Sequence, residues 1–400
     1  MYDSALNDQK SRFDWPMLAA LLGLMIVGAL FIASATLVSE GGSDTPIWKH
    51  AWLKQVVFYA IGLGLAGLVC VVPYHRLARW SLVLYWVMIV LLVAVLAVGA
   101  SRLGARRWID FGPIQFQPSE FAKLAFILAL GHYLSRPVEE LRRLTVFLKA
   151  LGFIALPFCL ILPEPDLGSA LVILPVGLAM MFIAGVPGRY LNWLGGGAAI
   201  LVVLLLVDVV LAPPQWRVKL EGYQKRRLLV YFGKQFVPPG ATEAERQRAS
   251  REYRDASYNV EQALISVGSG GLTGKGWRQG TQNALGYLPR AVAHNDFIFS
   301  VIAEESGFVG SVIVLSLYTV ILFSGIRIAG QARDRLGRLV AVGVVTLLFG
   351  HVFINIGMNI RLMPVTGIPL PLLSYGGTSV LCSLIAAGLL QNVYLYRRHY

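Results

Sequence analysis

The acid best placed for chemistry is Asp296, which lies where a long polar stretch meets a strongly apolar one. It ends the run His294-Asn295-Asp296 and directly precedes Phe297. Partial desolvation near a membrane surface raises the pKa of a carboxyl group, and such a carboxylate can act as a general base. The alternative is structural, because an aspartate before a helix commonly caps it. Position alone favours the cap.

A second candidate region is the stretch SRLGARRWIDFGPIQFQPSE, which contains Arg106, Arg107 and Trp108. Arginine forks match the oxygens of a phosphate group. A tryptophan beside them can stack on a sugar or anchor the chain at the membrane interface. The types of residue predict an anionic ligand, and for Trp108 alone the anchor is favoured.

Glu120 and Lys123 follow Pro118 at the start of an apolar run. Pro118 suits the first turn of a helix, and the spacing of three puts acid and base on one helix face. Ionisable residues at membrane depth are candidates for function. Two interpretations stay open: a working pair that faces a cavity, and a structural ion pair between helices.

Three further acids lie near apolar runs. Glu304 and Glu305 come about two helical turns after Asp296, and Asp166 lies in PEPDLGSA. A chain of acids in a membrane can relay protons in a transporter. For Asp166 we favour a helix cap.

The glycine-rich segment GSGGLTGKG, 268–276, does not match a nucleotide-binding P-loop. Such a loop needs glycine six residues before its lysine and serine or threonine after it, whereas Ser269 and Gly276 stand there. The glycines predict tight turns and close approach of the backbone to a ligand. Lys275 could still contact a phosphate.

These residues are set among apolar runs that dominate the chain. It has 400 residues, of which 56% are hydrophobic and 14% charged, against about a quarter charged in soluble domains. Cys70, Cys159 and Cys382 all fall in apolar runs and suggest neither a zinc site nor disulfides. Runs of the length that crosses a bilayer predict an all-α polytopic membrane protein, a single integral membrane domain over 1–400, with ten transmembrane helices at 17–37, 51–72, 80–100, 118–134, 145–162, 167–185, 191–211, 297–326, 339–359 and 372–395.

The first run lacks a cleavage site and is expected to be a span rather than a signal peptide. Positive charge in short loops gives the orientation. With the N-terminus inside, the cytoplasmic segments hold fourteen basic residues: Lys10, Arg12, Arg76, Arg79, Arg136, Arg142, Arg143, Arg189, Arg327, Arg333, Arg335, Arg338, Arg397 and Arg398. The short outer loops hold six: Lys49, Lys54, Arg102, Arg106, Arg107 and Arg361. Both termini are therefore expected in the cytoplasm. The net charge of +13 is mostly this topology signal and requires no nucleic acid.

The large loop between helices 7 and 8, 212–296, is then extracytoplasmic, and it is too long for a simple connector. Its start, QWRVKLEGYQKRRLLVYFGKQF, fits an interfacial helix or a solvated loop equally well. Residues 238–256 suggest a solvated excursion that could be helical. The segment MPVTGIPLPLLSYGGTS, 363–379, predicts a broken, re-entrant backbone, which is permitted at membrane depth where it is buried in protein or lines a cavity.

With these segments assembled, the chain resembles the SEDS family (shape, elongation, division and sporulation), and its RodA branch more than its FtsW branch. The similarity covers nearly the whole chain. It is carried by GARRWIDFGPIQFQPSEFAK, PEPDLGSA, SVGSGGLTGKGWRQGTQ, HNDFIFSVIAEESGFVG and PVTGIPLPLLSYGGTS.

The resemblance implies a peptidoglycan glycosyltransferase that polymerises lipid II on the outer face of the cytoplasmic membrane. The family acid falls in His-Thr-Asp-Phe, which here is His294-Asn295-Asp296-Phe297. Asp296 would be the general base for the acceptor 4-hydroxyl, and undecaprenyl diphosphate would leave with inversion of the sugar linkage.

The resemblance also implies a functional outer loop with Arg106, Arg107 and Trp108, and a working pair of Glu120 and Lys123. Positive charge suits a diphosphate leaving group, and Lys275 could add to it. A divalent cation, Mg²⁺ or Mn²⁺, could share that task, although no ligand cluster is evident. The implied partner is a class B penicillin-binding protein, a transpeptidase.

Four positions depart from the family pattern: Asn295, Arg290, Ser306 and Arg361, the last where glycine is usual. Two other functions remain as alternatives. One is a transporter that flips lipid II through a relay of Glu304, Glu305 and Glu120. The other is a scaffold that binds a penicillin-binding protein without chemistry.

Overall fold

The computed structural model describes residues 13–37, 46, 48, 50–102, 105–110, 115–164, 166–211, 230–231, 233, 242–288 and 290–397. The long helices in these ranges are α1 (Trp15–Ala35), α2 (Ala51–Val71), α4 (Ser81–Val98), α5 (Pro118–Leu134), α7 (Leu144–Ile161), α8 (Leu167–Ala184), α9 (Gly188–Leu211), α11 (Glu243–Ser269), α14 (Ile298–Gln331), α15 (Arg335–Asn359) and α16 (Gly377–Tyr396). The short helices are α3 (Tyr74–Arg79), α6 (Val138–Leu141), α12 (Thr281–Ala284) and α13 (Arg290–Ala293).

Each of the ten predicted spans overlaps one long helix, and the eighth and tenth differ most, by five residues at one end. The predicted tenth span begins at 372, whereas α16 begins at Gly377, because residues 363–376 form turns and irregular backbone. The predicted eighth span ends at 326, whereas α14 continues to Gln331. Gly307 interrupts α14 with φ 66° and ψ −161°, a conformation that glycine adopts without a steric penalty.

Seven of the described helices are long and apolar enough to cross a membrane: α1, α2, α7, α8, α14, α15 and α16. The chain is therefore a multi-pass membrane protein. The other three predicted spans coincide with α4, a shorter apolar helix, and with α5 and α9. Helix α5 carries Glu120 and Lys123 within an otherwise apolar sequence.

Local signals in the sequence set several helix ends. The side chains of Asp14, Asp166 and Asp334 accept hydrogen bonds from the backbone N–H groups of Met17, Ser169 and Gly337. Each thus satisfies a donor that a helix N-terminus leaves unpaired. The predicted cap at Asp166 is confirmed by this contact.

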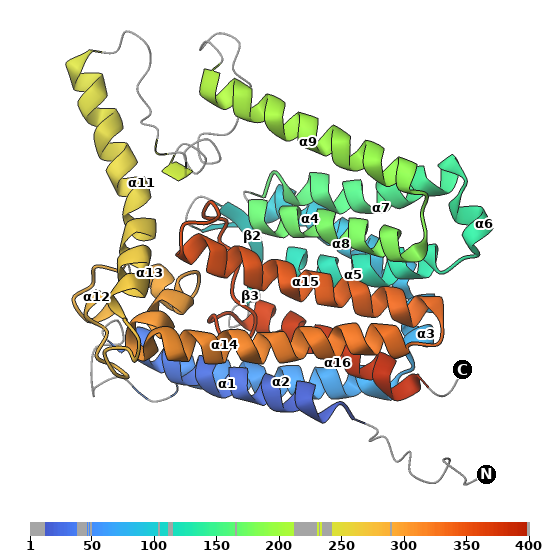
Figure 1. The fold of residues 1–400 in the computed structure, drawn as a ribbon, viewed down its shortest axis with the longest axis horizontal. Helices are drawn as coiled ribbons and strands as arrows, with labels where there is room; N and C mark the ends of the chain where they lie inside the picture. Colours follow the sequence, from blue (N-terminus) through green and yellow to red (C-terminus); the bar gives the residue numbers. More distant parts are fainter. Residues whose placement is uncertain are drawn as a thin grey trace.

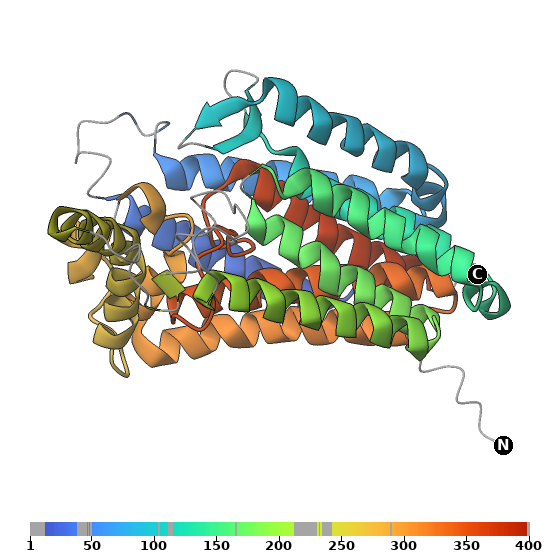
Figure 2. The same cartoon turned by 90° about the horizontal axis from the view of Figure 1, so that it is seen from above.

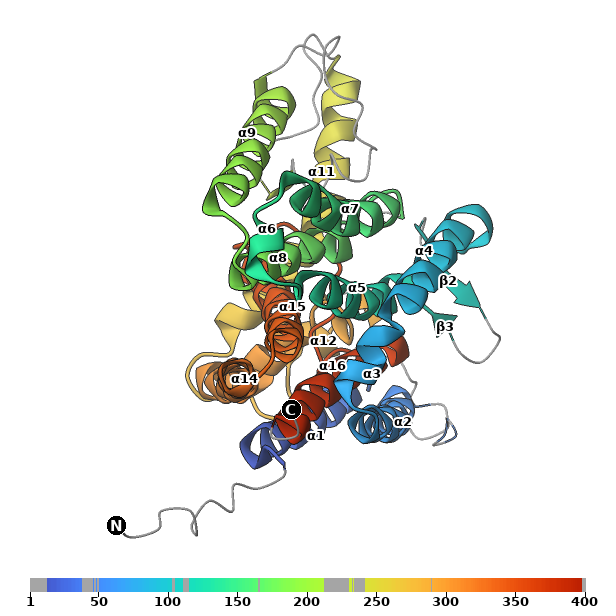
Figure 3. The ribbon, with the colours of Figure 1, turned by 90° about the vertical axis from the view of Figure 1, so that its right-hand side faces the viewer.

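The long helices other than α11 run roughly side by side, as Figure 1 and the view from above in Figure 2 show. Helix α1 begins and α16 ends at one end of the bundle, and α11, α12 and α13 lie at the other. The view down the bundle in Figure 3 places α5, α15 and α16 inside and α4 and α9 at the periphery. Helix α5 is accordingly buried along nearly its whole length.

A small sheet adds to the predicted all-α architecture. Strands β1 (Ala100–Arg102), β2 (Ala105–Asp110) and β3 (Gln115–Phe116) form an antiparallel sheet in the order β1-β2-β3. Ala100 pairs with Trp108, and Ile109 pairs with Phe116. The sheet joins α4 to α5 and holds the segment that contains Arg107 and Trp108.

The re-entrant segment, which we define as residues 360–376 between α15 and α16, is exposed at 360–362, buried at 370–374, and lacks regular structure. This agrees with the broken backbone predicted for 363–379, although α16 takes up its last three residues. Arg361 has a positive φ of 60°, a conformation that costs an L-residue roughly 1–2 kcal/mol. This accounts for the glycine that is usual in the resembling family.

The large predicted loop contains α11, α12 and α13. Residues 243–256 are helical as part of α11, in agreement with the helix considered for 238–256. Most of the possible interfacial helix, 215–236, lies outside the described residues, so that prediction stays open.

Candidate functional site

Asp296 lies in the turn between α13 and α14, with its backbone held from α15. The side-chain amides of Asn355 and Asn359 both donate to its carbonyl oxygen, at 3.1 Å and 3.2 Å. Its side chain is half-buried. The capping position of α14 is occupied by Phe297, whose side chain makes no capping hydrogen bond. The structure therefore does not support the expectation that Asp296 is the cap.

The two residues before Asp296 are held by the re-entrant segment. The N–H of Tyr375 donates to the carbonyl oxygen of His294 at 2.9 Å, and the two rings lie 5.5 Å apart between centroids. The hydroxyl of Ser374 donates to the carbonyl oxygen of Asn295 at 2.6 Å. The backbone of the predicted motif is thus fixed from two sides.

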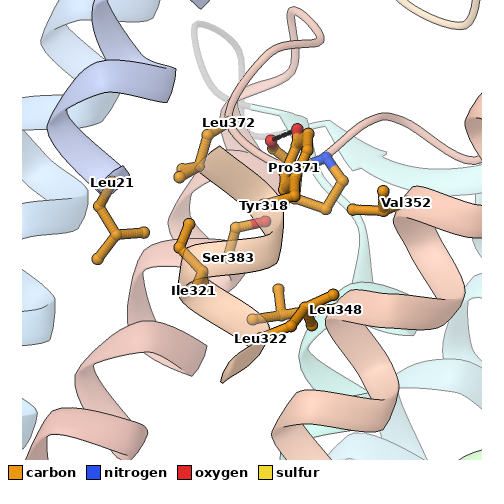
Figure 4. A pocket seen from close by; sticks show the side chains of 9 residues that line it. All are labelled: Leu21, Tyr318, Ile321, Leu322, Leu348, Val352, Pro371, Leu372 and Ser383. Carbon is orange, nitrogen blue, oxygen red and sulfur yellow. Dashed lines mark hydrogen bonds between the residues drawn. The ribbon is translucent and has the colours of Figure 1, made fainter. Parts of the chain in front are cut away.

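The re-entrant segment is itself held by side chains of three helices. Asn355 donates to the carbonyl oxygen of Ile368 at 2.7 Å, and Gln55 donates to that of Ser374 at 3.1 Å. The hydroxyl of Tyr318 donates to the carbonyl oxygen of Pro371 at 2.5 Å (Figure 4). Buried backbone carbonyls need such partners, and these helices supply them where the segment has no regular structure.

Tyr318 also lines a small, mostly apolar cavity, with Leu21, Leu348 and Val352 among its neighbours (Figure 4). The cavity has a volume of about 10 Å³, which is close to the minimum for one water molecule. This cavity is too small to hold a sugar or a lipid headgroup.

Glu120 and Lys123 form an ion pair of 2.6 Å, with side chains only 3% and 2% exposed. Lys123 Nζ also lies 2.9 Å from Nε2 of His351 and 3.5 Å from the hydroxyl of Ser169. A cavity beside the pair has a volume of about 10 Å³, which is room for about one water molecule. Of the two interpretations left open, the structure favours the ion pair that joins α5 to α8 and α15.

One face of α15 connects this pair to Asp296. His351, Asn355 and Asn359 are spaced by four residues, so their side chains lie above one another. His351 contacts Lys123, and Asn359 contacts the carbonyl of Asp296. With a rise of about 1.5 Å per residue, the two contacts lie roughly 12 Å apart along the helix. The four-residue spacing of His351, Asn355 and Asn359 in HVFINIGMN is the sequence signal for this face of α15.

Arg107 and Trp108 are adjacent in β2, and alternation in a strand directs their side chains to opposite faces. Arg107 turns towards the start of α8, where its Nε–H donates to the carbonyl oxygen of Glu164 at 2.9 Å. Trp108 is half-buried. The side chain of Arg106 lies outside the described residues. The predicted cluster is therefore divided, with Trp108 on one face of the strand and Arg107 on the other.

Lys275 binds to α14. Its Nζ lies 2.6 Å from a carboxylate oxygen of Glu304 and 2.7 Å from the hydroxyl of Thr281. A Cβ atom at Gly270 or Gly274 would overlap the backbone of α14. The glycine-rich segment was expected to approach a ligand closely, but the structure shows that it approaches this helix.

Glu304 and Glu305 are the acceptors that hold this segment. Glu304 also accepts from the N–H of Gln282 at 3.0 Å, and Glu305 accepts from the N–H of Arg278 at 3.0 Å and the hydroxyl of Ser34 at 2.5 Å. The acids that could have formed a proton relay are thus engaged in attaching the glycine-rich segment to α14 and α1.

Replacing Lys275 by alanine is expected to lower the free energy of unfolding by about 2–3 kcal/mol, because Glu304 is 1% exposed and loses the ammonium group that pairs with it. Thermal unfolding in detergent measures this. Arg278→Ala is the matched control, since the backbone N–H of Arg278 contacts Glu305 and its side chain is exposed. Loss of activity in Lys275→Ala at unchanged stability would instead assign Lys275 to the substrate.

Within the described part of the chain, no three His, Cys, Asp or Glu side chains come together to hold a metal ion. We derive no step through the divalent cation considered above.

The fold and these motifs define a class of multi-pass membrane protein, and comparison with known families identifies it. Residues 15–399 match the family model described as "Cell cycle protein" for FtsW, RodA and SpoVE, and the chain belongs to this family. It is 35% identical over 391 residues to the peptidoglycan glycosyltransferase MrdB of Escherichia coli K12, covering 97% of this chain and 95% of MrdB.

Solved structures agree with this assignment. A peptidoglycan synthase complex described as coordinating polymerization and crosslinking contains a similar chain, with a TM-score of 0.75 and 29% identity, covering 97% of this chain and 99% of the other. The rod shape determining protein RodA of Thermus thermophilus has a TM-score of 0.65 and 29% identity, with coverages of 96% and 98%.

Proposed function

We propose that this chain is a peptidoglycan glycosyltransferase of cell elongation that polymerises lipid II into glycan strands. The family match and the full-length similarity to MrdB support the enzyme class. The observation that carries the mechanism is the position of Asp296, whose backbone is held by Asn355 and Asn359 while its half-buried side chain lies at the start of α14.

Asp296 is the general base. Its carboxylate takes the proton of the acceptor GlcNAc 4-hydroxyl as that oxygen forms a bond to the anomeric carbon of the growing strand. The bond from that carbon to the diphosphate breaks, and undecaprenyl diphosphate leaves with the electron pair. Attack from the opposite face converts the α linkage to β-1,4.

Arg106 and Arg107 supply positive charge for the diphosphate, and Trp108 and His294 contact the substrate. Fixed charges aimed at a leaving group stabilise the charge that develops on it. Glu120, Lys123 and Lys275 act as positioning residues, because their observed contacts lie within the protein.

The chain crosses the cytoplasmic membrane ten times with both termini inside, and loop 212–296 with the active site outside. The charge count of the short loops supports this orientation. Helix α1 begins and α16 ends at the same end of the bundle (Figure 1). An even number of spans would place them so. Residues 1–400 form one integral membrane domain.

The partner is a class B penicillin-binding protein that crosslinks the glycan as it emerges. The similar chain found in a synthase that coordinates polymerization with crosslinking supports this pairing.

The test is polymerisation of purified lipid II in detergent by the full chain, alone and with its cognate penicillin-binding protein. We expect glycan strands without any ion gradient. Transport of lipid II across sealed vesicles, with no polymer under either condition, would favour the flippase. Neither activity, with tight binding of the penicillin-binding protein, would favour the scaffold.

A further inference from the structure

Glu164, in the turn between α7 and α8, is a buried acid to which the proposed mechanism gives no role. Its side chain has an exposure of 0%. Among the described residues, neither of its carboxylate oxygens has a hydrogen-bond partner. An ionised carboxylate without partners is costly to bury, so Glu164 holds a proton unless a nearby charge compensates.

The pKa of Glu164 is raised to about 8: burial contributes most, the neighbouring Asp166 adds to the rise, and Arg107 opposes it. Within the described residues, these two are the charged groups that act on it. The turn lies beyond the end of α7 at Ile161.

Asp166 has a different environment two residues away. Its carboxylate accepts from Gln117 Nε2 at 3.1 Å, from the Ser119 hydroxyl at 3.3 Å and from the Ser169 N–H at 3.1 Å. Hydrogen bonds to the charged form stabilise it. The two carboxyl groups thus differ in their surroundings: that of Asp166 has three hydrogen-bond donors, and that of Glu164 has none among the described residues.

The charge state of Glu164 affects Arg107, because the two residues are in contact: the Nε–H of Arg107 donates to the backbone oxygen of Glu164. With Glu164 protonated, the charges of Arg107 and Asp166 cancel. Ionisation of Glu164 gives the group of Arg107, Glu164 and Asp166, which we call the Arg107 corner, a net negative charge.

We propose that Glu164 controls the affinity of the Arg107 corner for the diphosphate of the substrate: protonated Glu164 permits binding, and ionised Glu164 opposes it. This inference rests on the proposed function, which places the diphosphate near Arg107. It makes Glu164 a positioning residue that acts through the local charge, without contact to the reacting atoms.

The test measures binding of undecaprenyl diphosphate to the full chain in detergent between pH 7 and pH 9.5. For the wild type we expect affinity to fall on the order of tenfold across this range, as expected for one added like charge near the ligand. Glu164→Gln is expected to bind as the wild type does at pH 7 and to keep that affinity at pH 9.5. Glu140→Gln, on the half-exposed α6, is the control that keeps the wild-type profile.

Stability supplies a second readout. The folded state of the wild type has the higher pKa, so its stability relative to Glu164→Gln falls as pH rises from about 5 to 8 and then levels off. If Glu164→Gln does not fold, Glu164→Leu fills similar space without a proton to lose.

The inference is overturned if the affinity of the wild type does not change with pH, or if the wild type does not bind at any pH. It is also overturned if the affinity of the glutamine or leucine variant falls with pH as that of the wild type does. Polymerisation of lipid II is scored separately, so failure of this control of affinity is distinguishable from failure of the proposed function.

Discussion

Replacing Asp296 by alanine is expected to reduce the rate of glycan synthesis by roughly 10²–10⁴-fold, the usual contribution of a positioned general base. The fold should persist, because Asn355 and Asn359 contact the backbone carbonyl of Asp296, which alanine retains. The measurement is the rate of lipid II polymerisation with the partner present, beside thermal unfolding of the same preparations.

Asp296→Asn is the sharper companion variant, since it keeps the size of the side chain and removes its ability to take a proton. We expect it to be as inactive as Asp296→Ala. Wild-type rates in either variant, with unchanged stability, would show that the mechanism assigned to Asp296 is wrong.

Breaking the Glu120–Lys123 pair is expected to have the largest effect on stability. Lys123→Met leaves a carboxylate that is 3% exposed without its ammonium partner, and removal of one member of a buried pair typically costs about 3–5 kcal/mol. Thermal unfolding in detergent should show this loss, together with a fall in activity.

The double variant Glu120→Gln with Lys123→Met is expected to recover a large part of the lost stability, because it buries no unpaired charge. Glu140→Gln is the exposed control: its pair with Arg136 has side chains 45% and 31% exposed and contributes about 0.3–0.5 kcal/mol. If Lys123→Met kept its stability and lost only activity, the lysine would contact substrate instead.

Much of the helical architecture could be predicted because apolar runs of span length have few alternatives in a bilayer. The predicted ranges of the first seven spans agree with helices to within a few residues. The tenth differs because prolines and glycines in 363–376 favour turns, and hydrogen bonds from Asn355, Gln55 and Tyr318 satisfy the freed backbone.

The candidate site was predicted less completely. Asp296 was singled out by its place at a polar–apolar junction, but the contacts that hold it come from Asn355 and Asn359, some sixty residues later in the chain. Glu164 was passed over because nothing in PEPDLGSA distinguishes a partnered acid from an unpartnered one.

The sequence by itself determined that the chain enters a membrane, where its helices run and which residue types could serve a phosphate and a base. The length, apolarity and charge of a segment are local properties, and they do not depend on which segments it contacts in the folded protein. Only the tertiary structure decided the roles of particular side chains. It attached Lys275 to Glu304 and buried Lys123 against Glu120 and His351. It also placed Arg107 on the backbone oxygen of Glu164, whose carboxyl group has no hydrogen-bond partner among the described residues. Those outcomes depend on contacts between segments far apart in the chain, and such contacts set both the charge state of an acid and its freedom to meet a substrate.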